Sequence, residues 1–123
     1  MSLLEKIKSL SEAHSARVVG WRRHLHANPE LSYQEFNTAK FVAAELSKLG
    51  LSPTEGIATI GVVVEIKGRN PEAKTMALRA DMDALPIFEK NDVPYKSKVE
   101  GVMHACGHDA HTASLLGTAA ILH

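Results

Sequence analysis

One short stretch of the sequence concentrates side chains that could bind a metal ion. Residues 104–111 read His-Ala-Cys-Gly-His-Asp-Ala-His and hold the only cysteine and three of the seven histidines. In an extended backbone, residues two apart project to the same side, so Cys106 and His108 can reach one point and His104 could join them. Thiolate and neutral imidazole are the ligands that zinc and similar metals select. An isolated Cys-x-His pair would favour a buried free cysteine among surface histidines, but this density of His and Asp favours a metal or catalytic site.

Two carboxylates form a second candidate group at the end of an apolar segment. Residues 75–82 predict a strand, and Asp81 and Asp83 fall on its polar face, shortly before Pro86. A strand end that carries acids beside a proline-fixed loop is a common place for a site in an α/β fold. The alternative is a turn whose aspartates accept hydrogen bonds from local backbone amides. Taken alone, this segment does not decide between the two interpretations.

Two helices are predicted before these groups. Apolar residues recur every three or four positions over residues 3–27, and Asn28-Pro29 ends that pattern because the residue before proline leaves the α region. The basic residues of this segment, Arg22 and His26 among them, are interpreted as a solvated helix face. The second helix is predicted over residues 32–49. Its start carries a capping-box pattern, with Ser32 as N-cap and Glu35 three residues on, and Gly50 suits the left-handed position that ends it.

The remaining segments predict an α/β fold. The apolar run in residues 57–67 indicates a strand covered on both faces, followed by turn residues and the predicted strand 75–82. Residues 87–103 are rich in polar residues and predict an irregular, exposed connection. A last helix is expected to begin at Asp109, and its apolar pattern still runs at the end of the chain. The pattern therefore predicts a chain cut within a domain.

Composition excludes several classes of protein. The 123 residues suffice for one small domain, and 45% apolar with 23% charged residues is typical of globular proteins. The 14 basic and 14 acidic residues cancel, so charge indicates neither a nucleic-acid nor a membrane partner. A single cysteine excludes an internal disulfide framework and favours a reducing compartment. The first residues lack a signal-peptide pattern, and no stretch reaches the roughly 20 apolar residues that span a bilayer. A cytoplasmic location is expected.

Three segments together resemble one enzyme family. They are residues 22–31, 78–87 and 103–112, which include Arg-Arg-His-Leu-His-Ala-Asn-Pro-Glu-Leu, Leu-Arg-Ala-Asp-Met-Asp-Ala-Leu-Pro-Ile and Met-His-Ala-Cys-Gly-His-Asp-Ala-His-Thr. The chain is similar to the N-acyl-amino-acid amidohydrolase branch of the aminoacylase/carboxypeptidase metallopeptidases, which includes hippurate hydrolase and indole-acetyl-amino-acid hydrolase. The resemblance implies that residues 1–123 are the N-terminal part of a three-layer α/β/α, zinc-peptidase-like catalytic domain. The rest of that domain and an inserted dimerisation domain are absent from the sequence.

The resemblance also implies roles for particular residues. Cys106 would be a metal ligand that bridges two ions, and His108 would be a second ligand. Asp83 matches a catalytic-site aspartate that orients a metal ligand without binding metal itself. Asp81 stands where many relatives carry a ligand histidine, and His108 would restore the missing imidazole.

Three further residues of the motif are assigned more loosely. His104 and His111 match the family pattern, but neither is expected to be a ligand. Asp109 is expected to cap the last helix or to support His108 as a hydrogen-bond partner.

The implied reaction is hydrolysis of the amide bond of N-acyl amino acids, of the hippurate type or related, by metal-activated water. Two divalent metal ions are implied, with zinc, manganese, nickel and cobalt all open, and the full-length enzyme is expected to be a homo-oligomer that acts on a small molecule. In the family, the general base comes from a Glu-Glu pair, and this sequence contains none. Residues 1–123 alone are therefore expected to be inactive.

Two alternatives remain at the level of the sequence. The first is a thiol enzyme in which Cys106 is the nucleophile and a nearby histidine is the base. The second is a non-catalytic metal-binding module, although closed structural zinc sites usually use four protein ligands and the chain has one cysteine. Metal protection of Cys106 would favour the metalloamidase, and a reactive thiol without metal would favour the thiol enzyme. A stable tetrahedral site in residues 1–123 would favour the module.

Overall fold

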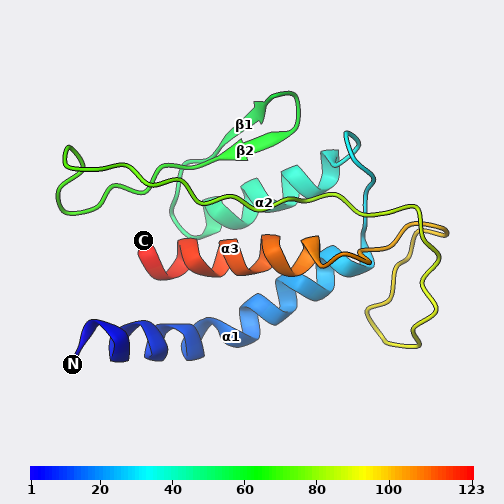
Figure 1. Cartoon of the computed structure of the whole chain (residues 1–123), viewed down its shortest axis with the longest axis horizontal. Coiled ribbons are helices and arrows are strands. Elements are labelled where there is room, and N and C mark those ends of the chain that lie inside the picture. Colours follow the sequence, from blue (N-terminus) through cyan, green and yellow to red (C-terminus); the bar gives the residue numbers. More distant parts are fainter.

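The structure, a computed structural model, describes all of residues 1–123 and contains three helices and one small hairpin (Figure 1). The helices α1 and α3 lie side by side and run in opposite directions, and α2 lies between α3 and the hairpin (Figure 1). The strands β1 and β2 pair antiparallel. The elements are, in order, α1 (Leu3–Ala27), α2 (Phe36–Lys48), β1 (Thr54–Ile57), β2 (Gly61–Val63) and α3 (His108–Leu122). No helix is long and apolar enough to cross a membrane.

The hydrophobic core lies where the three helices meet. Burial of each large apolar side chain there stabilises the fold by about 1.5–3 kcal/mol relative to its exposure. Partly buried side chains of the extended segments, Val62, Val64, Ile66 and Met82, pack against this core. Its buried members are Trp21 and Leu25 of α1, Val42 and Leu46 of α2, and Ala113, Leu116 and Ala119 of α3.

The bounds of α1 agree with the predicted helix over residues 3–27. Its first turn has a capping box that the sequence analysis missed: Ser2 Oγ accepts from the amide of Glu5, and Glu5 returns to the amide of Ser2. Only the C-terminal part of the predicted apolar face is buried in this structure. Leu3 and Leu4 are 75% and 61% exposed, whereas Trp21 and Leu25 are 5% and 2% exposed.

The predicted start of the second helix is wrong. Helix α2 begins at Phe36 and not at Ser32, and no side-chain cap comes from its N-cap residue. The carboxylate of Glu30 takes that role, because it accepts hydrogen bonds from the free amides of Asn37 and Thr38 in the first turn. The Ser32 hydroxyl instead donates to Asp83. The end of the helix is as predicted, with Gly50 at φ 87°.

The two predicted strands are wrong in their bounds. Ile57 ends β1, the chain reverses over residues 58–60, and β2 ends at Val63, which is 54% exposed and so not covered on both faces. The reversal uses left-handed backbone at Ala58 and Thr59. Residues 75–82 run as an extended segment without a strand partner. Apolar alternation reports the surroundings of side chains, while a strand also requires a neighbouring backbone.

Helix α3 begins at His108, one residue before the predicted start. The preceding Gly107 adopts φ 89°, a left-handed conformation that glycine reaches without a steric penalty. This turn joins Cys106 to the first residue of α3. The helix then lies against α1, so its first turn is held close to the C-terminal part of α1.

Candidate metal centre

Asp83 and His108 lie in contact where the extended segment 75–83 passes the start of α3. His108 Nδ1 is 2.9 Å from Asp83 Oδ1, and Ser32 Oγ donates to Asp83 Oδ2 over 3.3 Å. A carboxylate only accepts, so His108 donates from Nδ1, and its neutral form keeps the lone pair on Nε2. The predicted proximity of Asp83 to the loop 106–108 is therefore confirmed by the structure.

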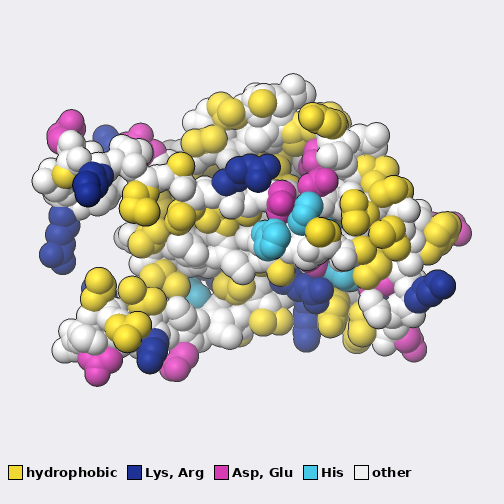
Figure 2. Space-filling view, in the orientation of Figure 1, with side chains coloured by type: hydrophobic (Ala, Val, Ile, Leu, Met, Phe, Trp, Pro, Cys, Tyr) yellow, Lys and Arg dark blue, Asp and Glu magenta, His cyan; other side chains and the backbone are white.

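Asp81 joins His108 to a second histidine. Its two carboxylate oxygens lie 3.4 Å from His108 Nε2 and 2.7 Å from His111 Nδ1. One possible ligand atom from each of Asp81, His108 and His111 falls within 4.8 Å of the others, which is close enough for one ion. The hydrogen bond from His111 lowers the pKa of Asp81, partial burial opposes that shift, and the charge of His108 adds to it. Figure 2 shows histidine and acidic side chains gathered on this face.

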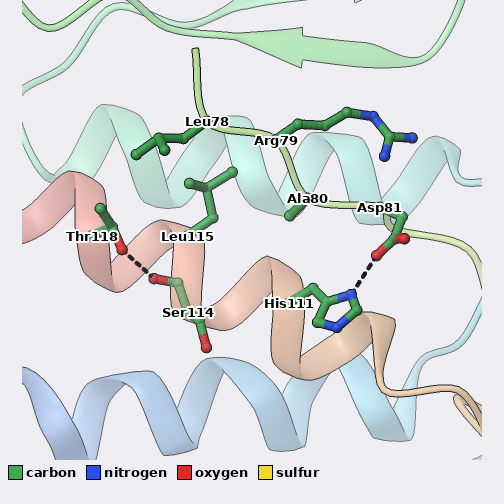
Figure 3. Close-up of a pocket in the computed structure, with 8 residues that line it drawn as sticks. All are labelled: Leu78, Arg79, Ala80, Asp81, His111, Ser114, Leu115 and Thr118. Carbon is green, nitrogen blue, oxygen red and sulfur yellow. Dashed lines mark hydrogen bonds and ion pairs between the residues drawn. The ribbon is translucent and has the colours of Figure 1, made fainter. Parts of the chain in front are cut away.

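An open depression of about 520 Å³ lies between the extended segment 75–83 and α3. Asp81 and His111 point toward one another at one end, and the side chain of Arg79 extends above Asp81 in this view (Figure 3). Ser114 and Thr118 of α3 line the other end with polar atoms (Figure 3). The depression gives a small polar molecule room beside the histidines.

The two remaining residues of the motif lie in different surroundings. Cys106 is exposed and is not a member of the group formed by Asp81, His108 and His111. His104 is 5% exposed, and neither ring nitrogen has a hydrogen-bond partner within the chain. Burial lowers the pKa of His104, although nearby Asp109 and Asp83 act in the opposite direction. The ligand roles assigned to this motif remain predictions.

Of the two roles expected for Asp109, a contact at the start of the last helix and support of His108, the structure shows only the first. One oxygen of Asp109 accepts from the amide of Ala110 in the first turn of α3, but the other lies 2.7 Å from His26 Nδ1 and 3.0 Å from Arg22 Nε. The interpretation of α1's basic residues as a solvated face is thus wrong for His26, which is 3% exposed. The spacing of four residues between Arg22 and His26 places both on one helix face and was the signal available in the sequence.

Comparison with known proteins shows which family the chain resembles. The family model of Peptidase family M20/M25/M40 matches residues 77–123, which include both candidate groups. The sequence is 53% identical to thermostable carboxypeptidase 2 of Saccharolobus solfataricus over 99% of this chain and 31% of that protein. The chain is similar to this family over residues 77–123. It is also 50% identical to an N-acyl-L-amino acid amidohydrolase of Geobacillus stearothermophilus, over 95% of this chain and 31% of that protein.

Solved structures of the M20 family confirm the predicted fold class, a partial α/β peptidase domain. The Bacillus subtilis YxeP protein, described as a dinuclear metal-binding peptidase, has a TM-score of 0.85 and 46% identity over 90% of this chain and 31% of its own. A protein of methicillin-resistant Staphylococcus aureus that is assigned as an aminohydrolase has a TM-score of 0.89 and 39% identity, over 96% of this chain and 30% of its own. The chain thus spans under one third of the length of these relatives.

Proposed function

We propose that this chain supplies the first ligands of a two-metal centre in an amidohydrolase that cleaves N-acyl amino acids, of the hippurate type or related. In this proposal, residues 1–123 form the N-terminal part of the catalytic domain. The observation that carries it is the contact between His108 Nδ1 and Asp83 Oδ1 at 2.9 Å. Metal-ligating histidines characteristically donate their second ring nitrogen to a carboxylate in this way.

The residues present fit a divalent metal ion. His108 Nε2 is the nitrogen left for coordination, and Cys106 lies two residues before it in an exposed position that an ion can reach. Thiolate and imidazole suit zinc, cobalt and nickel, while the nearby carboxylate of Asp81 widens the choice to manganese. Negative charge from Cys106 and Asp81 would offset the repulsion between two close cations.

Two bound divalent cations would supply an activated water and a polarised amide carbonyl. The residues of this chain hold and orient that centre. His108 and Cys106 would hold the ions, Asp83 fixes the tautomer and ring orientation of His108, and the hydroxyl of Ser32 donates to the other oxygen of Asp83. The depression beside Asp81 and His111 offers space for part of a small substrate.

The thiol-enzyme alternative gains no support from the structure. A cysteine nucleophile needs an imidazole beside its sulfur, and no hydrogen bond joins Cys106 to a histidine in residues 1–123. The relatives named as amidohydrolase and carboxypeptidase support metal-dependent amide hydrolysis instead. The alternative of a non-catalytic metal-binding module is not supported either, because the group of side chains that could hold one ion has three members and a closed structural zinc site usually has four.

Metal content measured beside thiol reactivity tests the proposal. In a protein that joins this chain to the rest of a family member's length, Cys106→Ser and His108→Ala should each remove tight metal binding and activity together. Bound metal should also protect Cys106 from alkylation. His14→Ala is the matched control, since no hydrogen bond or ion pair involves this α1 histidine. Full activity with normal metal content in Cys106→Ser would contradict the role of the thiolate.

A further inference from the structure

A second group of charged side chains joins α1, the loop 87–103 and the start of α3, and all of them except Arg22 are buried. It consists of Arg22 and His26 from α1, Glu89 from the loop 87–103, and Asp109 from α3. His26 stands at its middle, with Nδ1 2.7 Å from Asp109 and Nε2 3.0 Å from both oxygens of Glu89. We name these four residues the His26 network.

The His26 network has few alternative arrangements. Both nitrogens of His26 face carboxylates, which only accept, so the ring is held from two sides. The side chains of Asp109 and Glu89 are 0% and 4% exposed, so water cannot replace the donors that reach them. Burial alone would raise the pKa of Glu89, but hydrogen bonds from the Ser97 amide and from His26 lower it. The Glu89 carboxylate therefore stays charged and holds its donors.

Tyr95, from the loop 87–103, packs against residues of α1 that belong to or adjoin the network. The ring of Tyr95 meets His26 edge-on at 5.9 Å, and the guanidinium groups of Arg22 and Arg23 lie over the same ring at 5.4 and 4.7 Å. Arg22 also lies 3.0 Å from Asp109. A cation held by a carboxylate and by an aromatic face has less rotational freedom than a solvated arginine.

The network reaches both segments that present the candidate ligands. Asp109 follows His108 directly in the chain, so its contacts with α1 fix the first turn of α3. The backbones of Leu85 and Met103 are hydrogen-bonded to each other, so the end of the loop 87–103 lies beside its beginning. Glu89 follows Leu85 closely in the chain. The path from Met103 to Asp109 is thereby fixed at both ends, and Cys106 and His108 lie between those ends.

We propose that Arg22 and His26 are positioning residues that set the geometry of the Cys106 and His108 ligand pair through Asp109 and Glu89. This inference rests on the proposed function, because it assigns these residues to the same metal centre. Neither residue contacts the candidate ligands, so the effect passes through the backbone of residues 103–109. The network is thus separate from the contact between Asp83 and His108, which orients the imidazole ring alone.

The test compares His26→Ala with a designed rescue, the double variant His26→Gln with Glu89→Gln. In the rescue, the carboxamide introduced at position 26 can donate to Asp109 and accept from the carboxamide introduced at position 89. The oxygen of the latter still accepts from the amide of Ser97. His24→Ala is the control, because His24 lies on the same helix and stacks on Phe41 at 4.1 Å without touching the network. All variants are made in a full-length protein in which residues 1–123 are followed by the rest of a relative's sequence.

The first readout is Co²⁺ binding against a competing chelator, with the absorption bands of the bound ion. His26→Ala should weaken Co²⁺ binding roughly 10–100-fold and reduce the thiolate-to-cobalt band, as changes to outer partners of metal ligands do. The rescue should restore both, and His24→Ala should change neither. Affinity and bands in His26→Ala within about twofold of the unmodified protein would overturn the inference.

The second readout needs no metal and separates the two proposals. Hydrogen exchange without metal should speed up in residues 103–111 for His26→Ala and return toward normal in the rescue, with α2 unchanged. If the unmodified protein binds no Co²⁺, the proposed function fails, and this exchange pattern still decides whether the network fixes the segment. Unchanged exchange in residues 103–111 would overturn the positioning role whatever the metal result.

Discussion

At the scale of single residues, Asp83 is the side chain on which the candidate centre depends. One of its oxygens accepts a hydrogen bond from Nδ1 of His108, and the other accepts one from the hydroxyl of Ser32. The side chain is only 25% exposed, so its orientation is fixed from two sides. A histidine whose Nδ1 is committed in this way can offer only Nε2 to an ion.

Asp83→Asn should therefore retain metal while it lowers turnover. The amide oxygen can still accept from His108 Nδ1, but the charge that strengthens the ligand is lost, and roughly a 10–100-fold fall in activity is expected. Metal content and rate are measured on the same preparation of the complete enzyme. Asp92→Asn makes the same change at an exposed position and should leave both values unchanged. Unaltered turnover in Asp83→Asn would show that the contact does not matter for the reaction.

At the scale of elements, the approach of α3 to α1 is governed by one glycine. A Cβ added at Gly117 would lie 2.7 Å from Cγ2 of Val18 on α1, closer than side chains normally approach. Val18 is β-branched and has few other rotamers in a helix, so it cannot easily withdraw. The small residue at this position lets the two helices pack closely and so holds the start of α3 near α1.

Gly117→Ala should destabilise the fold by about 1 kcal/mol, because overpacking of about 1–3 kcal/mol exceeds the gain of about 1 kcal/mol in helix propensity. In a Val18→Ala background, the same change should instead stabilise the fold, since the clash is gone and the propensity gain remains. Denaturant unfolding of the four proteins gives the coupling. Equal effects of Gly117→Ala in both backgrounds would contradict the close contact.

The link between α1 and α2 predicts a pH dependence of stability. Trp21 Nε1 donates to Glu45 over 2.8 Å, and Lys48 lies 2.6 Å from the other oxygen. Burial would raise the pKa of Glu45, but these hydrogen bonds and the charges of Lys48 and Arg17 lower it below its ordinary value of 4.5. A lowered folded-state pKa means that this stabilisation is present above about pH 4.5 and is lost as the pH falls toward the folded-state value.

Glu45→Gln should therefore flatten the loss of stability as the pH falls below about 4.5 while it preserves an acceptor for Trp21. The measurement is the urea midpoint at each pH, compared with Glu12→Gln, an exposed glutamate on α1. The Glu12 variant should follow the unmodified protein. If Glu45→Gln also follows it, then Glu45 contributes nothing to the acid sensitivity.

The sequence predicted the helices better than the sheet, for reasons that particular residues make clear. The apolar repeat over residues 3–27 and the left-handed glycine at Gly50 act locally, and both predictions agree with the structure. The Ser32 capping pattern was also local, but in the folded chain the Ser32 hydroxyl donates to Asp83, and Glu30 accepts from the first-turn amide of Thr38 instead. The His26 network joins residues 83 positions apart, which no local pattern could reveal.

At the scale of the whole molecule, the chain combines a formed core with apolar surface that it does not cover. Leu3, Leu4, Met76, Leu78 and Phe88 are each more than half exposed. The relatives are about three times longer, since this chain covers 31% of thermostable carboxypeptidase 2. Isolated apolar side chains are ordinary on a surface, but a cluster near the start of α1 favours contact with other protein.

Residues 1–123 alone should bind metal weakly and show no hydrolysis of hippurate or other N-acyl amino acids. Cys106 and His108 are two ligands, a catalytic two-metal site needs more, and no Glu-Glu pair provides the base. The assay adds zinc, manganese, nickel or cobalt to the purified chain and records release of the free amino acid. Hydrolysis above that of the same metal without protein would contradict this expectation.

An anomalous diffraction map of a zinc-loaded crystal, grown from the full-length protein that contains this chain, would show whether Cys106 and His108 bind metal. A peak is expected about 2.0–2.1 Å from His108 Nε2 and about 2.3 Å from Cys106 Sγ, while His108 Nδ1 remains on Asp83. Zinc bound to Asp81 and His111 without Cys106 and His108 would contradict the proposed ligand roles. So would a His108 ring that has turned away from Asp83 to bind through Nδ1.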